Sequence, residues 1–326
     1  MWRRTRAYNF AVDIDCVERM PLILSILLRI AIVIVIAVMF CTDVYASQAR
    51  TLEHISVGDI PVIISKPASI TSATRLVVLF HGFGPPGDPE HLAEAIPLDD
   101  TSFFGVYVNM PMVAKRLPAG GIDELRRVQL DDFVNGLYFR SISGAAHELS
   151  TIVRFVEKNY GLNSARGIGL FGFSAGGSAA LLSLTQSDVP ISCVVVVNAP
   201  LSVRQNVAVW ERELKNKFVW DEKSEQAAAT FDVLAHANDI AHRKPRPAIL
   251  FLQGDQDEHL ATQPVQEVGA VLKKSYGKDQ SKIDVRILSG VSHNFAPVAK
   301  DDNGQRISDG ALIRDASITW LEKWLG

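Results

Sequence analysis

One serine lies in a glycine-rich turn that could make it a nucleophile. The run Gly172-Phe173-Ser174-Ala175-Gly176-Gly177 follows a short apolar segment and precedes a stretch rich in Ala and Leu. Glycine at 172 and 176 removes the Cβ atoms that would clash in a very tight strand-to-helix turn. Such a turn exposes the serine hydroxyl beyond the strand, next to a helix N-terminus that favours negative charge. The bare letters also fit a glycine-rich turn with a solvated serine, but the flanking strand and helix favour the nucleophile.

A serine hydroxyl needs a base to accept its proton, and the base needs an acid to orient it. Four histidines follow Ser174, at positions 236, 242, 259 and 293. His293 comes just after the last strand-like run, where a loop can reach the end of the sheet, so we predict it to be the base. His236 and His242 lie in a polar segment, and we expect them to be solvated.

The acid is expected in the segment Gly254-Asp255-Gln256-Asp257, which follows another apolar run. Gly254 can form the turn, and Asp257 is then best placed to face the cleft. Asp255 is the alternative, although an Asp at that position is also a common turn former.

A fourth polar turn, His81-Gly82-Phe83-Gly84, ends a strand-like run of its own. Backbone N–H groups there could bind a carbonyl oxygen that gains negative charge. We predict an oxyanion hole formed by the amides of Phe83 and Ala175, and one such donor contributes about 3 kcal/mol in a transition state. The ring of His81 is predicted to stabilise this loop through hydrogen bonds.

No metal site or cofactor site is predicted. Asp255, Asp257 and His259 alternate in a way that could suggest a metal, but no further cluster of ligands at metal spacing supports it. The glycines at 167, 169 and 172 match a dinucleotide-binding pattern by letter, but they fall inside a predicted strand instead of after it. Cys193, in an apolar run, is predicted to be a buried packing residue.

The elements that must position these residues alternate along the chain. Strand-like runs are mostly continuously apolar, which is typical of parallel strands covered on both faces, and they cover 60–65, 75–80, 105–109, 167–171, 193–197, 248–252 and 283–288. Helical patterns cover 145–158, 176–185, 263–275 and 311–325. Residues 55–64 predict an antiparallel hairpin. The fold class is therefore α/β, a doubly wound and mostly parallel sheet.

A long segment at residues 200–247 separates two of the predicted core strands. It contains helical pieces at 207–216 and 224–237, and its aromatic residues Trp210, Phe218 and Trp220 are expected to be exposed. An excursion of this length is usually functional, so we predict a small helical cap. Its aromatic residues either line an acyl pocket or pack the cap onto the sheet.

The first 46 residues are predicted to stand apart from the globular domain, which covers 47–326. Residues 21–41 are almost entirely apolar, basic residues precede them, and Val44-Tyr45-Ala46 offers a cleavage site. This layout indicates a signal peptide, with a retained membrane anchor as the alternative. Either interpretation predicts an exported protein, and Met20 is an alternative start.

Composition excludes several other classes. Of the 326 residues, 48% are hydrophobic, which is enough to form a core and excludes a disordered chain. The 33 Lys and Arg do not outnumber the 36 Asp and Glu, which argues against a basic nucleic-acid binder. With 3 cysteines, a disulfide scaffold is also excluded.

Taken together, residues 54–326 resemble the α/β-hydrolase family. The resemblance rests on four motifs in the order that is typical of the family, namely His81-Gly82-Phe83-Gly84, Gly172-Phe173-Ser174-Ala175-Gly176, Gly254-x-x-Asp257 and Ser292-His293. It implies a catalytic triad of Ser174, Asp257 and His293. The subfamily stays open, because the His-Gly-Phe-Gly loop differs from the His-Gly-Gly-Gly loop of hormone-sensitive-lipase-like esterases.

The resemblance implies a serine hydrolase that works through an acyl-enzyme and needs no cofactor. We expect a small-molecule carboxylic ester as substrate, no nucleic-acid partner, and membrane contact only through the N-terminal segment. A serine peptidase or thioesterase would use the same residues. A catalytically silent protein that binds a ligand in the cleft is the alternative from another class.

Overall fold

The computed structural model describes residues 50–299, 301–303 and 308–326, and these form one compact unit. Its centre is an eight-stranded sheet in the order β1-β2-β4-β3-β5-β6-β7-β8. The strands from β4 to β8 pair in parallel, whereas β2 pairs antiparallel with both β1 and β4. Their bounds are β1 (Leu52–Val57), β2 (Ile60–Ser65), β3 (Leu76–Phe80), β4 (Phe104–Val108), β5 (Ile168–Phe173), β6 (Ile191–Val197), β7 (Ala248–Gln256) and β8 (Ile283–Ser292).

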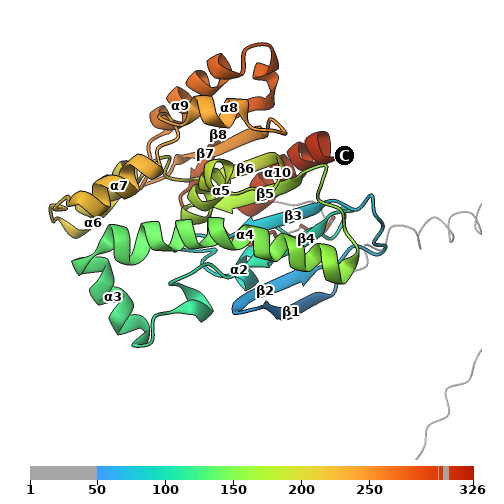
Figure 1. The fold of residues 1–326 in the computed structure, drawn as a ribbon, viewed down its shortest axis with the longest axis horizontal. Helices are drawn as coiled ribbons and strands as arrows, with labels where there is room; N and C mark the ends of the chain where they lie inside the picture. The colour runs from blue at the N-terminus through green and yellow to red at the C-terminus, as the bar shows by residue number, and fades with distance from the viewer. Residues whose placement is uncertain (1–49, 300, 304–307) are drawn as a thin grey trace, which may run out of the picture. The chain divides into compact units, whose positions relative to one another are not determined.

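Helices cover both faces of the sheet (Figure 1). One buried cluster packs α4, α5 and α9 onto one face, and a second packs α2 and α10 onto the other. The helices are α2 (Pro89–Ala95), α3 (Gly121–Asp131), α4 (Phe139–Tyr160), α5 (Ala175–Gln186), α6 (Val203–Leu214), α7 (Glu222–Thr230), α8 (Ala237–His242), α9 (Thr262–Tyr276) and α10 (Asp309–Leu325). Short helical turns are η2 (Ala114–Arg116), η3 (Phe133–Tyr138), which is π-helical, and η4 (Gly277–Lys282).

The predicted mostly parallel α/β sheet is confirmed. Every predicted strand is present, and the antiparallel hairpin is formed by β1 and β2 around Gly58, whose φ is +59°. The strands β3 to β7 are almost fully buried, which explains why they lack a polar–apolar alternation. Continuous burial is therefore what made these strands recognisable in the sequence.

Two expectations about the 200–247 segment are wrong. The helix expected over 224–237 is instead α7, a non-helical stretch and then α8. The reason is that the backbone of Phe231 and Val233 pairs with Val203 and Leu201, which pulls the chain out of the helix. Trp210, expected to be exposed, is only 5% exposed, and Phe218 and Trp220 pack partly buried against the core.

The predicted signal peptide or anchor at 1–46 lies outside the described residues. Among the residues that are described, no helix combines the length and the apolar character needed to cross a bilayer.

Candidate active site

Ser174 occupies the sharp turn between β5 and α5. Its φ of 51° and ψ of −122° place it in a conformation that side-chain-bearing residues rarely adopt. The turn is held on the sheet by a hydrogen bond from the Ser174 amide to the carbonyl of Val197, at 2.9 Å. The backbone therefore projects the serine hydroxyl beyond the carboxyl end of β5.

The glycines of this turn are required by direct contacts. A Cβ on Gly172 would lie 2.2 Å from the carbonyl oxygen of Gly176, and a Cβ on Gly176 would lie 2.3 Å from that of Phe80. Neither backbone atom can move away without displacing the first turn of α5 or the end of β3. The sequence motif thus reflects a close approach of three backbone segments.

A chain of hydrogen bonds joins the three residues that sequence analysis singled out. The Oγ of Ser174 lies 3.1 Å from Nε2 of His293, and Nδ1 of His293 lies 2.9 Å from Oδ2 of Asp257. Since the carboxylate accepts from Nδ1–H, it leaves Nε2 free to accept the serine proton. The three side chains come from the ends of β5, β7 and β8, which the parallel pairing brings to one edge of the sheet.

Asp257 is held in its ionised form. Burial by itself raises the pKa of its carboxyl, but the hydrogen bond and charge of His293 and the amides of Leu260 and His259 outweigh burial, so its pKa lies below the usual 3.8. Oδ1 accepts from those two amides at 2.8 and 2.9 Å, and Oδ2 also accepts from the side chain of Gln253 at 2.8 Å. A carboxylate with four donors is fixed in position as well as in charge.

The loop that follows β3 packs directly against the nucleophile turn. A Cβ on Gly82 would lie 2.8 Å from the Phe173 ring and 3.0 Å from the Cβ of Ser174. Phe83, the next residue, lines the same cavity as Ser174 and His293. Ala175 opens α5 immediately after Ser174. The two amides expected to form an oxyanion hole are thus both adjacent to the nucleophile turn.

His81 is fully buried under this loop. Its Nδ1 donates to the carbonyl of Gly82 at 2.7 Å, and its Nε2 accepts from the amide of Met110 at 3.1 Å. These two bonds require the neutral ring. Burial lowers the pKa of His81 to about 4. The structure therefore gives His81 the hydrogen-bonded place in the loop that was predicted.

A cavity of about 260 Å³ opens in front of Ser174. Its wall is largely apolar and includes Phe83, Phe133, Val209, Trp210, Leu214 and Leu260, with polar groups from Gln129, Asn206, Glu213 and Asn294. Sequence analysis missed Phe133 and Gln129, because neither residue follows a predicted strand or belongs to one of the four motifs. A mainly apolar pocket with a few polar groups is typical of a small-molecule site.

One aromatic side chain of the 200–247 segment, Trp210, lines this cavity and packs against its wall. Trp210 stacks on Phe133 with ring centres 5.7 Å apart, and its indole N–H donates to the carbonyl of Gln129 at 2.8 Å. Phe133 in turn stacks on Tyr138, at 6.0 Å. Figure 1 shows α6 and α7 at the same end of the molecule as α3 and the start of α4. Trp210 thus both lines the cavity and packs against Phe133, whereas Phe218 and Trp220 pack against the core and do not line the cavity.

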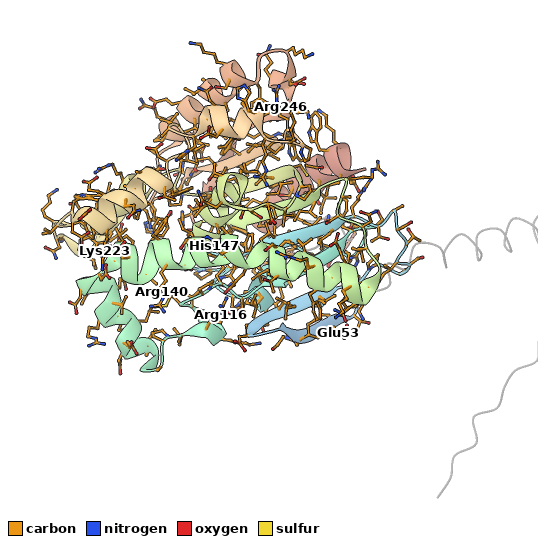
Figure 2. All side chains as sticks on the ribbon, in the orientation of Figure 1. Glu53, Arg116, Arg140, His147, Lys223 and Arg246 are labelled. Carbon is orange, nitrogen blue, oxygen red and sulfur yellow. The ribbon has the colours of Figure 1, made fainter. Side chains whose placement is uncertain are left out.

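Other polar residues near the motifs lie outside the hydrogen-bonded chain. Asp255 is exposed and accepts from the amide of Gly290, so it shapes a turn. His236 and His242 bond to neighbouring residues of their own segment. His147 lies on α4 and bonds back to Ser143, while Arg116, also labelled in Figure 2, ties the loop after β4 to Glu148. His259 lines the cavity, with its ring centre 4.7 Å from that of His293.

The described residues contain neither a cluster of metal-ligating side chains nor an exposed thiol. They contain no group of three or more His, Cys, Asp or Glu side chains arranged to hold a metal ion. Cys193 is fully buried in β6, and burial raises the pKa of its thiol. It belongs to the buried cluster on the face that α2 and α10 cover, so the prediction of a packing residue is confirmed.

Comparison with solved structures defines the class of protein. A Thermus thermophilus protein, TT1662, is 16% identical, with a TM-score of 0.57, 85% of this chain covered and 98% of that one. An esterase of Pyrococcus furiosus is 15% identical, with a TM-score of 0.52 and coverages of 85% and 91%. An acylaminoacyl peptidase is 17% identical, with a TM-score of 0.55 and coverages of 85% and 41%. The fold is that of an α/β-hydrolase.

Sequence comparison then places the chain within that class. The profile of the prolyl oligopeptidase family matches residues 132–309, which is more than half of the chain and spans Ser174, Asp257 and His293. This protein belongs to the prolyl oligopeptidase family and is a serine hydrolase. A search of curated protein sequences found no significant match.

Proposed function

We propose that this protein is a carboxylic ester hydrolase in which Ser174, His293 and Asp257 form the catalytic triad. The observation that carries the proposal is the hydrogen-bonded chain from Ser174 Oγ through both nitrogens of His293 to Asp257, at 3.1 and 2.9 Å. This chain ends in a mainly apolar cavity that would hold an acyl group beside the hydroxyl.

The reaction follows from the positions of these atoms. His293 Nε2 takes the proton of Ser174 as its Oγ attacks the ester carbonyl. The amides of Phe83 and Ala175 donate to the oxygen that becomes negative, and the N-terminus of α5 favours the same charge. The tetrahedral intermediate collapses, the alcohol leaves with the proton from His293, and the acyl group stays on Ser174.

The second half of the reaction repeats the first with water. His293 removes a proton from a water molecule, whose oxygen attacks the acyl-enzyme, and Ser174 regains its proton as the carboxylic acid departs. Throughout, Asp257 stays ionised and stabilises the imidazolium. The depressed pKa of Asp257 supports this role, because the carboxylate then keeps its charge at neutral pH.

The first experiment compares wild type with Ser174→Ala on p-nitrophenyl acetate and butyrate. We expect kcat to fall by at least about 10³-fold in Ser174→Ala. Ser192→Ala is the matched control, since Ser192 lies at the amino end of β6 and its hydroxyl donates to the carbonyl of Arg166. Equal rates in wild type and Ser174→Ala would refute the proposal and would favour a silent binding protein.

A serine peptidase is the second candidate, because the family profile that matches is named for an oligopeptidase. The small pocket supports an ester substrate, since the described cavity of about 260 Å³ accommodates a compact acyl group. N-acetyl-alanine p-nitrophenyl ester and N-acetyl-alanine p-nitroanilide share one acyl group and separate the two functions. We expect hydrolysis of the ester alone, whereas Ser174-dependent cleavage of the anilide would favour the peptidase.

We also propose that residues 1–46 export the enzyme, either as a cleaved signal peptide or as an anchor at residues 21–41. The support is the order of basic, apolar and small residues in the sequence. Its substrate would then be a small ester outside the cytoplasm.

A further inference from the structure

The carboxyl end of β6 carries a buried polar residue that the mechanism above does not use. Asn198 follows Val197, the last residue of β6, and is only 1% exposed. Its backbone φ is 43°, in the left-handed region where Asn is tolerated better than most residues. It does not line the cavity in front of Ser174. Its position in the sheet is nevertheless central, because β6 lies between the strand that carries Ser174 and the strand that carries Asp257.

The side chain of Asn198 makes three hydrogen bonds to two loops of the site. Its amide nitrogen donates to the carbonyls of Ser292 and His293, both at 2.8 Å. Its amide oxygen accepts from the backbone N–H of Gly254, also at 2.8 Å. The side chain of Asn198 therefore spans β7 and links Gly254, near the end of that strand, to the loop that carries His293.

The backbone at the same point holds the nucleophile. The carbonyl of Val197 accepts from the amide of Ser174, and the amide of Asn198 donates to the carbonyl of Leu252, both at 2.9 Å. Two consecutive residues thus contact the backbone of all three segments that supply the Ser–His–Asp chain. Only an amide side chain offers two donors and one acceptor at this length, so Asp, Ser, Leu or Ala cannot reproduce the set.

We infer that Asn198 is a positioning residue for the proposed triad, setting the distance between His293 and Ser174 through the backbone of the His293 loop. This inference rests on the proposed function. In wild type the Nε2–Oγ separation is 3.1 Å, and the side-chain amide of Asn198 joins the end of β6 both to Gly254 and to the His293 loop. A shift of about 1 Å in such a pair lowers the rate by roughly 100-fold.

The test uses Asn198→Gly and Asn198→Asp. Glycine keeps the positive φ and removes the side chain, whereas Asp keeps the shape but replaces two donors with acceptors that repel the carbonyls. We expect kcat to fall by about 10- to 100-fold in both variants. KM should change less than threefold in each, because Asn198 does not touch the cavity.

Tyr276→Phe is the matched control. Tyr276 is equally buried, and its hydroxyl donates at 2.9 Å to the carbonyl of Pro247, just before the amino end of β7 and so at the opposite edge of the sheet. The Tyr276→Phe variant loses one buried hydrogen bond far from the site. Its free energy of unfolding should therefore fall, while its kcat should stay within twofold of wild type. A loss of kcat in the Asn198 variants that is matched by Tyr276→Phe would overturn the inference.

Two readouts do not depend on ester turnover. The low-field proton NMR signal of the His293–Asp257 hydrogen bond should shift or broaden in the folded Asn198 variants and stay unchanged in Tyr276→Phe. The rate of labelling by a fluorophosphonate should fall in parallel with kcat. If wild type is labelled but hydrolyses no ester, the ester function fails while the role of Asn198 is still measured. A wild-type NMR signal and labelling rate in folded Asn198→Gly would contradict the inference.

Discussion

At the scale of single residues, the proposed mechanism depends on which carboxylate accepts the hydrogen bond of His293 Nδ1. The side chain of Asp257 is buried and accepts from four donors, whereas Asp255, two residues earlier, is exposed and bonds to the amide of Gly290. Asp255 lies in the last two residues of β7 and Asp257 directly follows the strand, and both were candidates from the sequence. What separates them is the direction of each side chain at the end of the strand, which only the folded loop reveals.

Asp257→Asn should lower kcat by roughly 10⁴-fold, because an amide at this place favours the wrong tautomer of the imidazole. Asp255→Asn should retain activity within about twofold, since surface changes away from a site have small effects. The comparison of kcat on p-nitrophenyl butyrate checks both variants. A larger loss in Asp255→Asn than in Asp257→Asn would show that the acid has been misassigned.

His81 predicts a dependence of stability on pH. Its pKa falls from 6.5 to about 4 on burial, so below pH 6.5 the unfolded chain binds a proton that the folded chain does not. Stability therefore decreases as pH falls from about 6.5 to 4, by about 3 kcal/mol from this residue. Urea unfolding of wild type and His81→Gln across this range measures the effect. The variant should show a shallower dependence, and parallel curves would count against the neutral, buried ring.

At the scale of elements, the nucleophile turn is specified by steric exclusion. A methyl group on Gly176 would meet the carbonyls of Phe80 and His81 at 2.3 and 2.5 Å. The turn, the end of β3 and the start of α5 are therefore in direct backbone contact. This is why the Gly-x-Ser-x-Gly pattern was informative, since few other turns demand glycine at both places.

Gly176→Ala should destabilise the protein by more than 3 kcal/mol or prevent folding, because a backbone clash has no flexible partner that could yield. Gly161→Ala is the control. Gly161 also has a positive φ, of 70°, but a Cβ there has nothing within 4 Å. Gly161→Ala should therefore lower the free energy of unfolding by only about 1 kcal/mol. Thermal unfolding of both variants measures the difference. Similar losses would mean that the turn is looser than described.

Helix α6, which lines the cavity, predicts selectivity for the acyl chain. Val209 lines the cavity, while Val219 is 84% exposed outside it. Val209→Phe should narrow the cavity and lower kcat/KM for p-nitrophenyl octanoate at least about tenfold more than for the acetate. Val219→Phe should leave the ratio unchanged. If both variants gave the wild-type ratio, the acyl chain would have to bind elsewhere.

Most of the strands could be predicted from the sequence, for a physical reason. Strands β3, β5, β6 and β7 are buried on both faces, so their apolar runs are continuous and their ends mark where functional residues begin. The helix α3 has no buried residue and left no such signal. Asn198 follows a predicted strand as the predicted site residues do, but its partners lie up to 95 residues away, and no local pattern encodes them.

At the scale of the whole molecule, the sheet order places β3, β5, β6, β7 and β8 side by side. The residues that follow β5, β7 and β8 therefore meet at one edge, next to the loop that follows β3. The serine, the acid and the histidine lie far apart in the chain, and parallel pairing alone brings them to one edge. Family membership and fold agree with this arrangement. The proposed triad therefore depends on how the side chains of Ser174, His293 and Asp257 meet at that edge.

The N-terminal segment gives a prediction for a protein that includes residues 1–46. Expression of residues 1–326 in a bacterial host should yield active protein in the exported fraction. N-terminal sequencing should start at Ser47, because Val44-Tyr45-Ala46 presents small or modest residues for cleavage. An intact N-terminus in the membrane fraction would instead identify the anchor, and protein confined to the cytoplasm would contradict export.

The most direct test of the central claim is covalent labelling of the nucleophile. Folded wild-type protein is treated with a fluorophosphonate, and the modified peptide is located by mass spectrometry. The proposed triad predicts one label per chain, on Ser174, and no label in Ser174→Ala. Labelling should be slow in His293→Ala, because the serine there has lost its base. A label on any other residue, or full hydrolytic activity without modification of Ser174, would contradict it.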